Sequence, residues 1–127
     1  MVRITFRPAS WHGTGSVKAE GHAEHGPQGE DLVCAAVTAL VEGFAANLDY
    51  IPGLQQTRRV GNGVEELRWY HQYHGGHNGV QEANSAAWHF YRALEALAKA
   101  YPEAVSVRWL KQEYYKAGKG RPKHDSV

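Results

Sequence analysis

The sequence predicts an α+β fold with the element order β-β-α-β-β-α-β, in which two helices pack on one face of a mixed sheet. Three observations lead to this prediction. Apolar and polar side chains alternate over the first residues, two longer stretches carry apolar residues at helical spacing, and an Asn-Gly turn separates two further strand-like stretches. A chain of 127 residues is long enough for a single core. We therefore expect one domain over residues 1–115, followed by a tail over residues 116–127.

The first two strands are predicted to form a hairpin. Residues 2–7 alternate apolar and polar side chains, which is the pattern of a half-buried strand. A turn over residues 9–15 leads into the second strand, residues 16–22, which pairs with the first. The loop over residues 23–30 contains two glycines and a proline and therefore continues neither a strand nor a helix.

A helix is predicted from Asp31 to about residue 48, because apolar residues recur there at intervals of three and four. These residues are Val33, Ala36, Val37, Leu40, Val41, Phe44 and Leu48. Alanines occupy much of the remaining surface, so we expect the helix to be apolar nearly all round and buried against the sheet. It ends before the Ile51-Pro52-Gly53 segment.

The second half of the chain repeats this order of elements. Two strands, residues 56–60 and 64–72, flank the Gly61-Asn62-Gly63 turn, and residues 73–84 are glycine-rich and irregular. A second helix is predicted from Ser85 to about Tyr101, with Asn84 or Ser85 as its N-cap. Pro102 stops the helix, and a last strand with alternating side chains spans residues 105–109.

Composition limits the cellular setting and the partners of the chain. The formal net charge of +1 gives no overall attraction to nucleic acid or membrane, and the single cysteine excludes an internal disulfide. The N-terminal residues contain no apolar run typical of a signal peptide or membrane span, so we expect a cytoplasmic protein with no membrane association. The tail carries Lys116, Lys119, Arg121 and Lys123. It is predicted to be a disordered, solvated segment, with a weak contact to ribosomal RNA as the alternative.

One histidine and the only cysteine are placed where they could act together. His22 ends the second predicted strand, and Cys34 lies in the first turn of the first predicted helix. A thiol becomes a nucleophile near neutral pH when a base lies beside it and its surroundings favour the thiolate. His22 could supply the base, and the positive end of the helix dipole favours the thiolate. The alternative is a small, buried packing cysteine.

Asp31 has two interpretations. As the helix N-cap it would stabilise the fold by about 1 kcal/mol. As a third member of the site it would orient the His22 imidazole and stabilise its charged form. The backbone N–H groups of residues 33–35 are candidates for an oxyanion hole, and His25 in the connecting loop is an alternative base.

The residues around this pair resemble the ribosomal-processing cysteine protease family, Prp. The resemblance rests on Gly21-His22-Ala23 and on Gly29-Glu30-Asp31-Leu32-Val33-Cys34-Ala35-Ala36-Val37-Thr38, and it covers the N-terminal third of the chain residue by residue. It implies that Cys34 is the nucleophile and that His22 is the general base and then the acid. Gly21 would allow a bend or a close approach of the substrate. Thr38 would support the site, although the family typically has Ser at that position.

The resemblance also implies a substrate and partners. Members of the family remove an N-terminal extension from a large-subunit ribosomal protein, so this chain would cut such a protein, or a phage capsid or scaffold precursor, after an apolar, aromatic-rich motif. The family further implies a homodimer, and the mechanism needs no cofactor.

Two other functions fit parts of the sequence. One is a non-catalytic, ribosome-associated binding module with the same fold. The other is a metal-binding protein built on His71, His74 and His77, because imidazoles suit zinc, nickel or copper. No nearby cysteine or carboxylate completes a tetrahedral set, so we expect no metal site and interpret residues 71–77 as an exposed loop.

Overall fold

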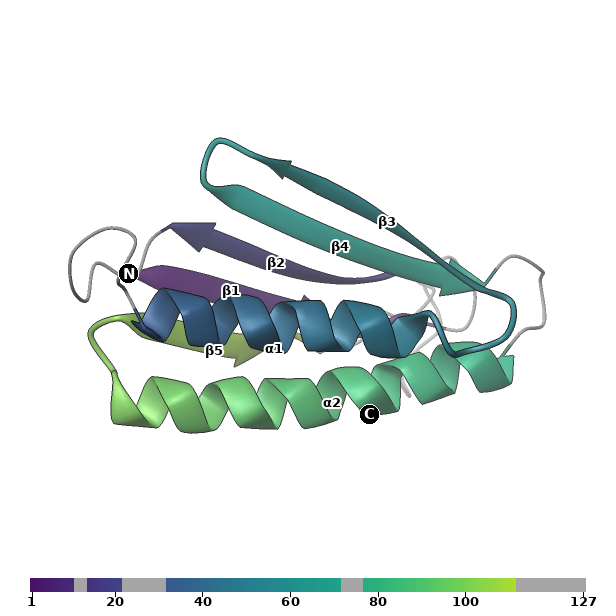
Figure 1. The fold of residues 1–127 in the computed structure, drawn as a ribbon. Helices are drawn as coiled ribbons and strands as arrows, with labels where there is room; N and C mark the ends of the chain where they lie inside the picture. The colour runs from purple at the N-terminus through teal and green to yellow at the C-terminus, as the bar shows by residue number, and fades with distance from the viewer. Residues whose placement is uncertain (11–13, 22–31, 72–76, 112–127) are drawn as a thin grey trace, which may run out of the picture.

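The computed structural model describes residues 1–10, 14–21, 32–71 and 77–111 as five strands and two helices (Figure 1). In chain order these are β1 (Val2–Arg7), β2 (Gly15–Gly21), α1 (Leu32–Leu48), β3 (Leu54–Gly61), β4 (Val64–His71), α2 (His77–Ala100) and β5 (Val105–Trp109). The strands form one sheet in the order β3-β4-β2-β1-β5. Pairing is antiparallel except between β1 and β5, which are parallel, so the predicted mixed α+β fold and its element order are confirmed.

Both helices cover the same face of the sheet, and among the described residues no element covers the other face (Figure 1). Successive side chains of a strand point to opposite faces, so each strand contributes one set of residues to the core. In β1 the core set is Val2, Ile4 and Phe6, all at most 3% exposed. Local alternation in the sequence therefore determined which side of this central strand faces the helices.

Trp69 of β4 lies at the centre of the core and is fully buried. Its ring meets that of Phe44 from α1 edge to face, with centroids 5.1 Å apart. Its indole N–H donates to Oδ1 of Asn84 on α2 over 3.3 Å. The Asn84 side chain also accepts from the Ala9 N–H (2.9 Å) and donates to the Ala9 carbonyl (2.8 Å). Trp69 and Asn84 thus connect both helices, β4 and the segment after β1.

Helix α1 is buried on one face only, so the expectation of a helix buried nearly all round was wrong. Its fully buried side chains are Val33, Val37, Val41, Phe44, Ala45 and Leu48. Ala35, Thr38, Ala39 and Ala46 are exposed. Apart from Leu32, the exposed apolar positions are alanines, whose small surface costs little in water, whereas the larger apolar residues are buried or half-buried.

Helix α2 begins at His77, eight positions before the predicted start at Ser85, so residues 77–84 were wrongly assigned to an irregular segment. Asn84 and Ser85 are interior helix residues, and neither is the N-cap. The core-facing positions Val80 and Ala83 continue the stripe of Ala87 and Leu94, all at most 5% exposed. Burial of this stripe offsets the cost of glycine in the first turns of a helix, about 1 kcal/mol per residue.

The turn between β3 and β4 has the predicted hairpin geometry. Asn62 and Gly63 both adopt positive φ, 51° and 74°, as the favoured two-residue hairpin turns require. Strand β3 begins at Leu54, two residues before the predicted start at residue 56. Strand β4 ends at His71, one residue before the predicted end at residue 72.

Neither α1 nor α2, the helices of the described residues, has the length and apolar character needed to cross a membrane. The predicted tail, residues 116–127, lies outside the described residues.

The close approach of Gly15 to Trp69 predicts a sharp stability difference between two glycines. A Cβ on Gly15 would overlap the Trp69 indole, whereas a Cβ on Gly61 would meet nothing within 4 Å. Neither has a positive φ, so backbone strain does not enter the comparison. We expect Gly15→Ala to lower the free energy of unfolding by about 1–3 kcal/mol, the usual cost of overpacking a core.

Gly61→Ala is the matched control and should stay within about 0.5 kcal/mol of the unsubstituted protein. Chemical denaturation of both variants measures the difference. An equal effect of the two substitutions would contradict the role assigned to the Trp69 contact.

Candidate active site

The last residue of β2, Gly21, adopts a conformation that favours glycine. Its φ is +90°, and a Cβ at this position would overlap the carbonyl oxygen of Met1. The Gly21 N–H donates to the Gly63 carbonyl over 3.0 Å, and Gly21 pairs with Val2 across the hairpin. The backbone therefore bends at the strand end, which is one of the two roles expected for this glycine. Residue 22 directly follows Gly21, whose backbone is held by Val2 on one side and Gly63 on the other.

Cys34 is the third residue of α1, in the first helical turn as expected. It is a free cysteine of intermediate burial that packs against the hydrophobic core. The buried Val33 beside it, 2% exposed, anchors the start of the helix to the sheet. Cys34 is therefore held in the first turn of a helix whose start is anchored to the core.

The end of β2 and the start of α1 lie at the same end of the molecule, where the N-terminus also lies (Figure 1). This arrangement follows from the pairing of β1 with β2 and from the packing of α1 along the sheet. His22, Asp31 and His25 lie outside the described residues, so their roles stay predictions. Thr38 is exposed one helical turn beyond Cys34, on the same side of α1.

Leu32 is a feature of this region that the sequence analysis did not single out. It is the first residue of α1, two positions before Cys34, and it is 81% exposed. Helical periodicity does not predict that Leu32 is exposed, because a leucine in an apolar helix is expected to be a core residue. An exposed leucine in the same helical turn as the thiol adds apolar surface at the start of α1.

His71 does not lie in an exposed loop, so that expectation was wrong. It ends β4 and is half-buried, with its ring between two glycines. A Cβ on Gly53 would lie 2.6 Å from His71 Nε2, and a Cβ on Gly79 would lie 3.0 Å from Cδ2. The ring thus packs where the turn before β3 meets α2.

No group of three metal-ligating side chains occurs among the residues that the structure describes. His74 and the side chain of His77 lie outside that part of the chain. The absence of a metal site at residues 71–77 stays a prediction.

Comparisons with known proteins were made for sequence and for structure. The model of the family described as cysteine protease Prp matches residues 1–106. A comparison with curated proteins found no match. Among solved structures, the chain is similar to the essential ribosomal processing protease Prp from S. aureus with a covalently linked product peptide. That match has 18% identity and a TM-score of 0.68, and it covers 87% of this chain and 100% of the other.

A second solved structure is that of SMU.848 from Streptococcus mutans. It has 24% identity and a TM-score of 0.64, and the match covers 88% of this chain and 99% of the other. The S. aureus Prp in complex with a substrate peptide is also similar, with 19% identity and a TM-score of 0.63 over 87% of this chain and the whole of the other. These likenesses support the fold described above.

We expect the Cys34 thiol to react faster with an alkylating reagent than a half-buried packing thiol would. A half-buried packing thiol reacts slowly with iodoacetamide, whereas a thiolate at the helix start reacts fast even at about pH 6.5. The control is Cys34→Ala combined with Thr38→Cys, which places a thiol on the exposed surface one turn further along the same helix. We expect Cys34 to be alkylated on the order of tenfold faster than that control thiol.

The two rates can be measured by mass spectrometry on intact protein. Slower alkylation of Cys34 than of the control, in line with the lower exposure of Cys34, would identify it as a packing residue.

Proposed function

The chain belongs to the cysteine protease Prp family, and on this basis we propose that it is an endopeptidase that removes an N-terminal extension from a ribosomal protein. The observation that carries the proposal is the position of Cys34 in the first turn of α1, inside the segment matched by the family model. The S. aureus relative is described as a ribosomal processing protease and has been seen with substrate and product peptides. A phage capsid or scaffold precursor with a similar cleavage motif is the alternative substrate within the same proposal.

The proposed mechanism divides the hydrolysis into two acyl transfers. His22 takes the proton of the Cys34 thiol, and the thiolate sulfur attacks the carbonyl carbon of the scissile peptide bond. The carbonyl oxygen gains negative charge, which backbone N–H groups of residues 33–35 would stabilise. The C–N bond then breaks, His22 gives its proton to the leaving amine, and a thioester remains on Cys34. Water attacks the thioester with His22 again as base, which releases the second product and restores the thiol.

Several features support this assignment. Gly21 fixes the backbone immediately before His22, so the base would leave the sheet from a defined position. Val33 anchors the helix start on which Cys34 sits. Leu32, exposed in the same helical turn as Cys34, offers a contact for the apolar motif expected in the substrate. The proposed enzyme needs no cofactor, acts in the cytoplasm, and forms the homodimer that the family implies.

The direct test is cleavage of a peptide that carries an apolar, aromatic-rich motif at the processing site. We expect turnover by the unsubstituted protein and loss of turnover, by at least about a thousandfold, in Cys34→Ala and in His22→Ala. Both variants should unfold at the temperature of the unsubstituted protein, because neither side chain is asked to hold the core together. The assay follows product formation by liquid chromatography.

Asn47→Ala is the matched control, since Asn47 is exposed at the far end of the same helix and has no role in the proposed mechanism. Tight binding of the peptide without cleavage by the unsubstituted protein would instead identify a non-catalytic binding module.

The two interpretations of Asp31 predict different outcomes for Asp31→Asn. Asn caps a helix nearly as well as Asp but carries no charge that could stabilise an imidazolium. If Asp31 orients His22, turnover falls by on the order of a hundredfold or more at an unchanged melting temperature. If Asp31 only caps α1, turnover stays near that of the unsubstituted protein. In that case Asp31→Ala lowers the free energy of unfolding by about 1 kcal/mol, which denaturation measures.

A further inference from the structure

The face of the sheet opposite the helices is covered by no helix or strand of the described residues, and it carries a surplus of positive charge (Figure 1). In the described strands, its basic side chains are Arg3, Arg7, Lys18, Arg59, Arg68 and Arg108, as the strand register places them. Its acidic side chains, over the same residues, are Glu20 and Glu66. Over the described strands this face therefore carries four more basic than acidic side chains.

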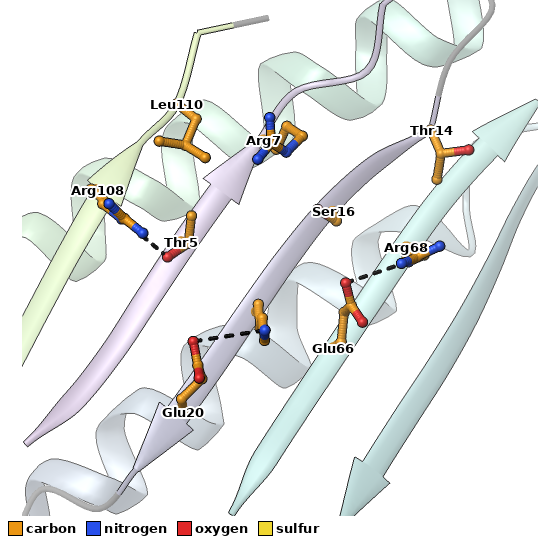
Figure 2. Close-up of a pocket in the computed structure, with 10 residues that line it drawn as sticks. Thr5, Arg7, Thr14, Ser16, Glu20, Glu66, Arg68, Arg108 and Leu110 are labelled. Atoms are coloured by element: carbon orange, nitrogen blue, oxygen red, sulfur yellow. Dashed lines mark hydrogen bonds and ion pairs between the residues drawn. The ribbon is translucent and has the colours of Figure 1, made fainter. Parts of the chain in front are cut away.

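A hollow of about 490 Å³ lies in the middle of this face (Figure 2). We call it the basic basin and define it by Thr5, Arg7, Ser16, Lys18, Arg68 and Arg108, which all line it. Glu20, Glu66, Thr14 and Leu110 line it as well, so four basic and two acidic side chains face the hollow. The register arranges these side chains in two rows across the strands. Ser16 lies between Arg7 and Arg68, and Thr5 lies between Lys18 and Arg108. Each row therefore has a short hydroxyl side chain between two long cationic ones, which makes the surface concave and rich in hydrogen-bond donors.

The acidic side chains on the open face only partly neutralise its positive charge. Glu66 is shared by Arg59 and Arg68, at 2.7 and 3.4 Å. Lys18 and Glu20 are 3.9 Å apart, and Arg108 donates to the neutral Thr5 hydroxyl over 3.4 Å. The Lys18–Glu20 pair is exposed, and such pairs contribute about 0–1 kcal/mol, so a phosphate can compete for Lys18 at little cost. Glu66 is only 12% exposed, so its pairs with Arg59 and Arg68 are not of this kind.

An exposed aromatic ring lies beside the basin. Tyr70 is two positions beyond Arg68 in β4 and therefore on the same face, and it is 37% exposed. Each of the four nucleobases can stack on such a ring, so this contact does not depend on the nucleotide sequence. A protein partner would instead require an apolar centre in the contact surface, whereas the centre here consists of hydroxyl and charged groups.

We propose that the open face of the sheet binds a single strand of RNA, with phosphates in the basic basin and a base stacked on Tyr70. The hydroxyl groups of Thr5 and Ser16 match the 2′-hydroxyl of RNA, which both donates and accepts hydrogen bonds. Cys34 lies on α1, which covers the other face of the sheet, so bound RNA and a bound peptide would not compete (Figure 1). This binding activity goes beyond the proposed proteolysis and does not depend on it.

The test measures binding of a fluorescently labelled single-stranded RNA of mixed sequence by anisotropy at several salt concentrations. We expect Lys18→Gln/Arg68→Gln to weaken binding about tenfold and to reduce the salt slope by about two, since two phosphate contacts are removed. The matched control is Arg92→Gln/Lys99→Gln, which removes one Arg and one Lys from exposed positions of α2. This control should bind RNA as the unsubstituted protein does.

The aromatic ring is tested separately. Tyr70→Ala should weaken binding by about fivefold or more, whereas Tyr70→Phe, which keeps the ring, should bind normally. Melting temperatures and peptide cleavage of all variants show that they are folded.

Three results would overturn the proposal. Unchanged binding in Lys18→Gln/Arg68→Gln would assign the RNA to another part of the chain, such as the basic tail. An equal loss of RNA affinity in the two double variants would show that binding depends only on the overall charge of the protein. Equally tight binding of single-stranded DNA of the same sequence would overturn the assignment to RNA.

Discussion

The packing of Trp69 is the constraint on which the rest of the structure depends. Its fully buried ring lies against Gly15 of β2 and Phe44 of α1, and its N–H is bonded to Asn84 of α2. Asn84 in turn holds the backbone of Ala9 by two hydrogen bonds. The distances between sheet, α1 and α2 are thus set around one side chain, and the buried polar groups of this cluster have their partners.

This packing also determines where the proposed chemistry can occur. Phe44 and Val33 lie on the same buried stripe of α1, so fixing the helix at Trp69 fixes its first turn and with it Cys34. The other half of the proposed site leaves the sheet at Gly21, which is held by Met1, Val2 and Gly63. The two described ends of the proposed site, Gly21 and Cys34, therefore both lie on elements that the core holds in place.

A sheet covered on one side only gives a small domain two different surfaces. The helix side carries the core and Cys34, while the open side carries polar and basic residues that need no cover. The alternation that buries Ile4 and Phe6 also presents Thr5 and Arg7 on the opposite face. A domain of this size can therefore hold a peptide site and a polyanion surface without enlarging its core.

The sequence by itself determined the local features. Alternation over residues 2–7 specified β1, helical spacing around Cys34 specified the first turn of α1, and the residues around that cysteine indicated the family. These features depend on neighbours within a few positions, which the sequence displays directly.

Only the tertiary structure decided the rest, because it depends on contacts between residues distant in the sequence. Helix α2 extends back to His77 because Val80 and Ala83 are buried in the core, and Gly79 leaves room for the side chains of His71 and Ile51. The parallel pairing of β5 with β1 brings Arg108 beside Thr5, about a hundred positions away in the sequence. No short stretch of sequence can indicate this pairing, and the basic basin that depends on it cannot be recognised from the sequence either.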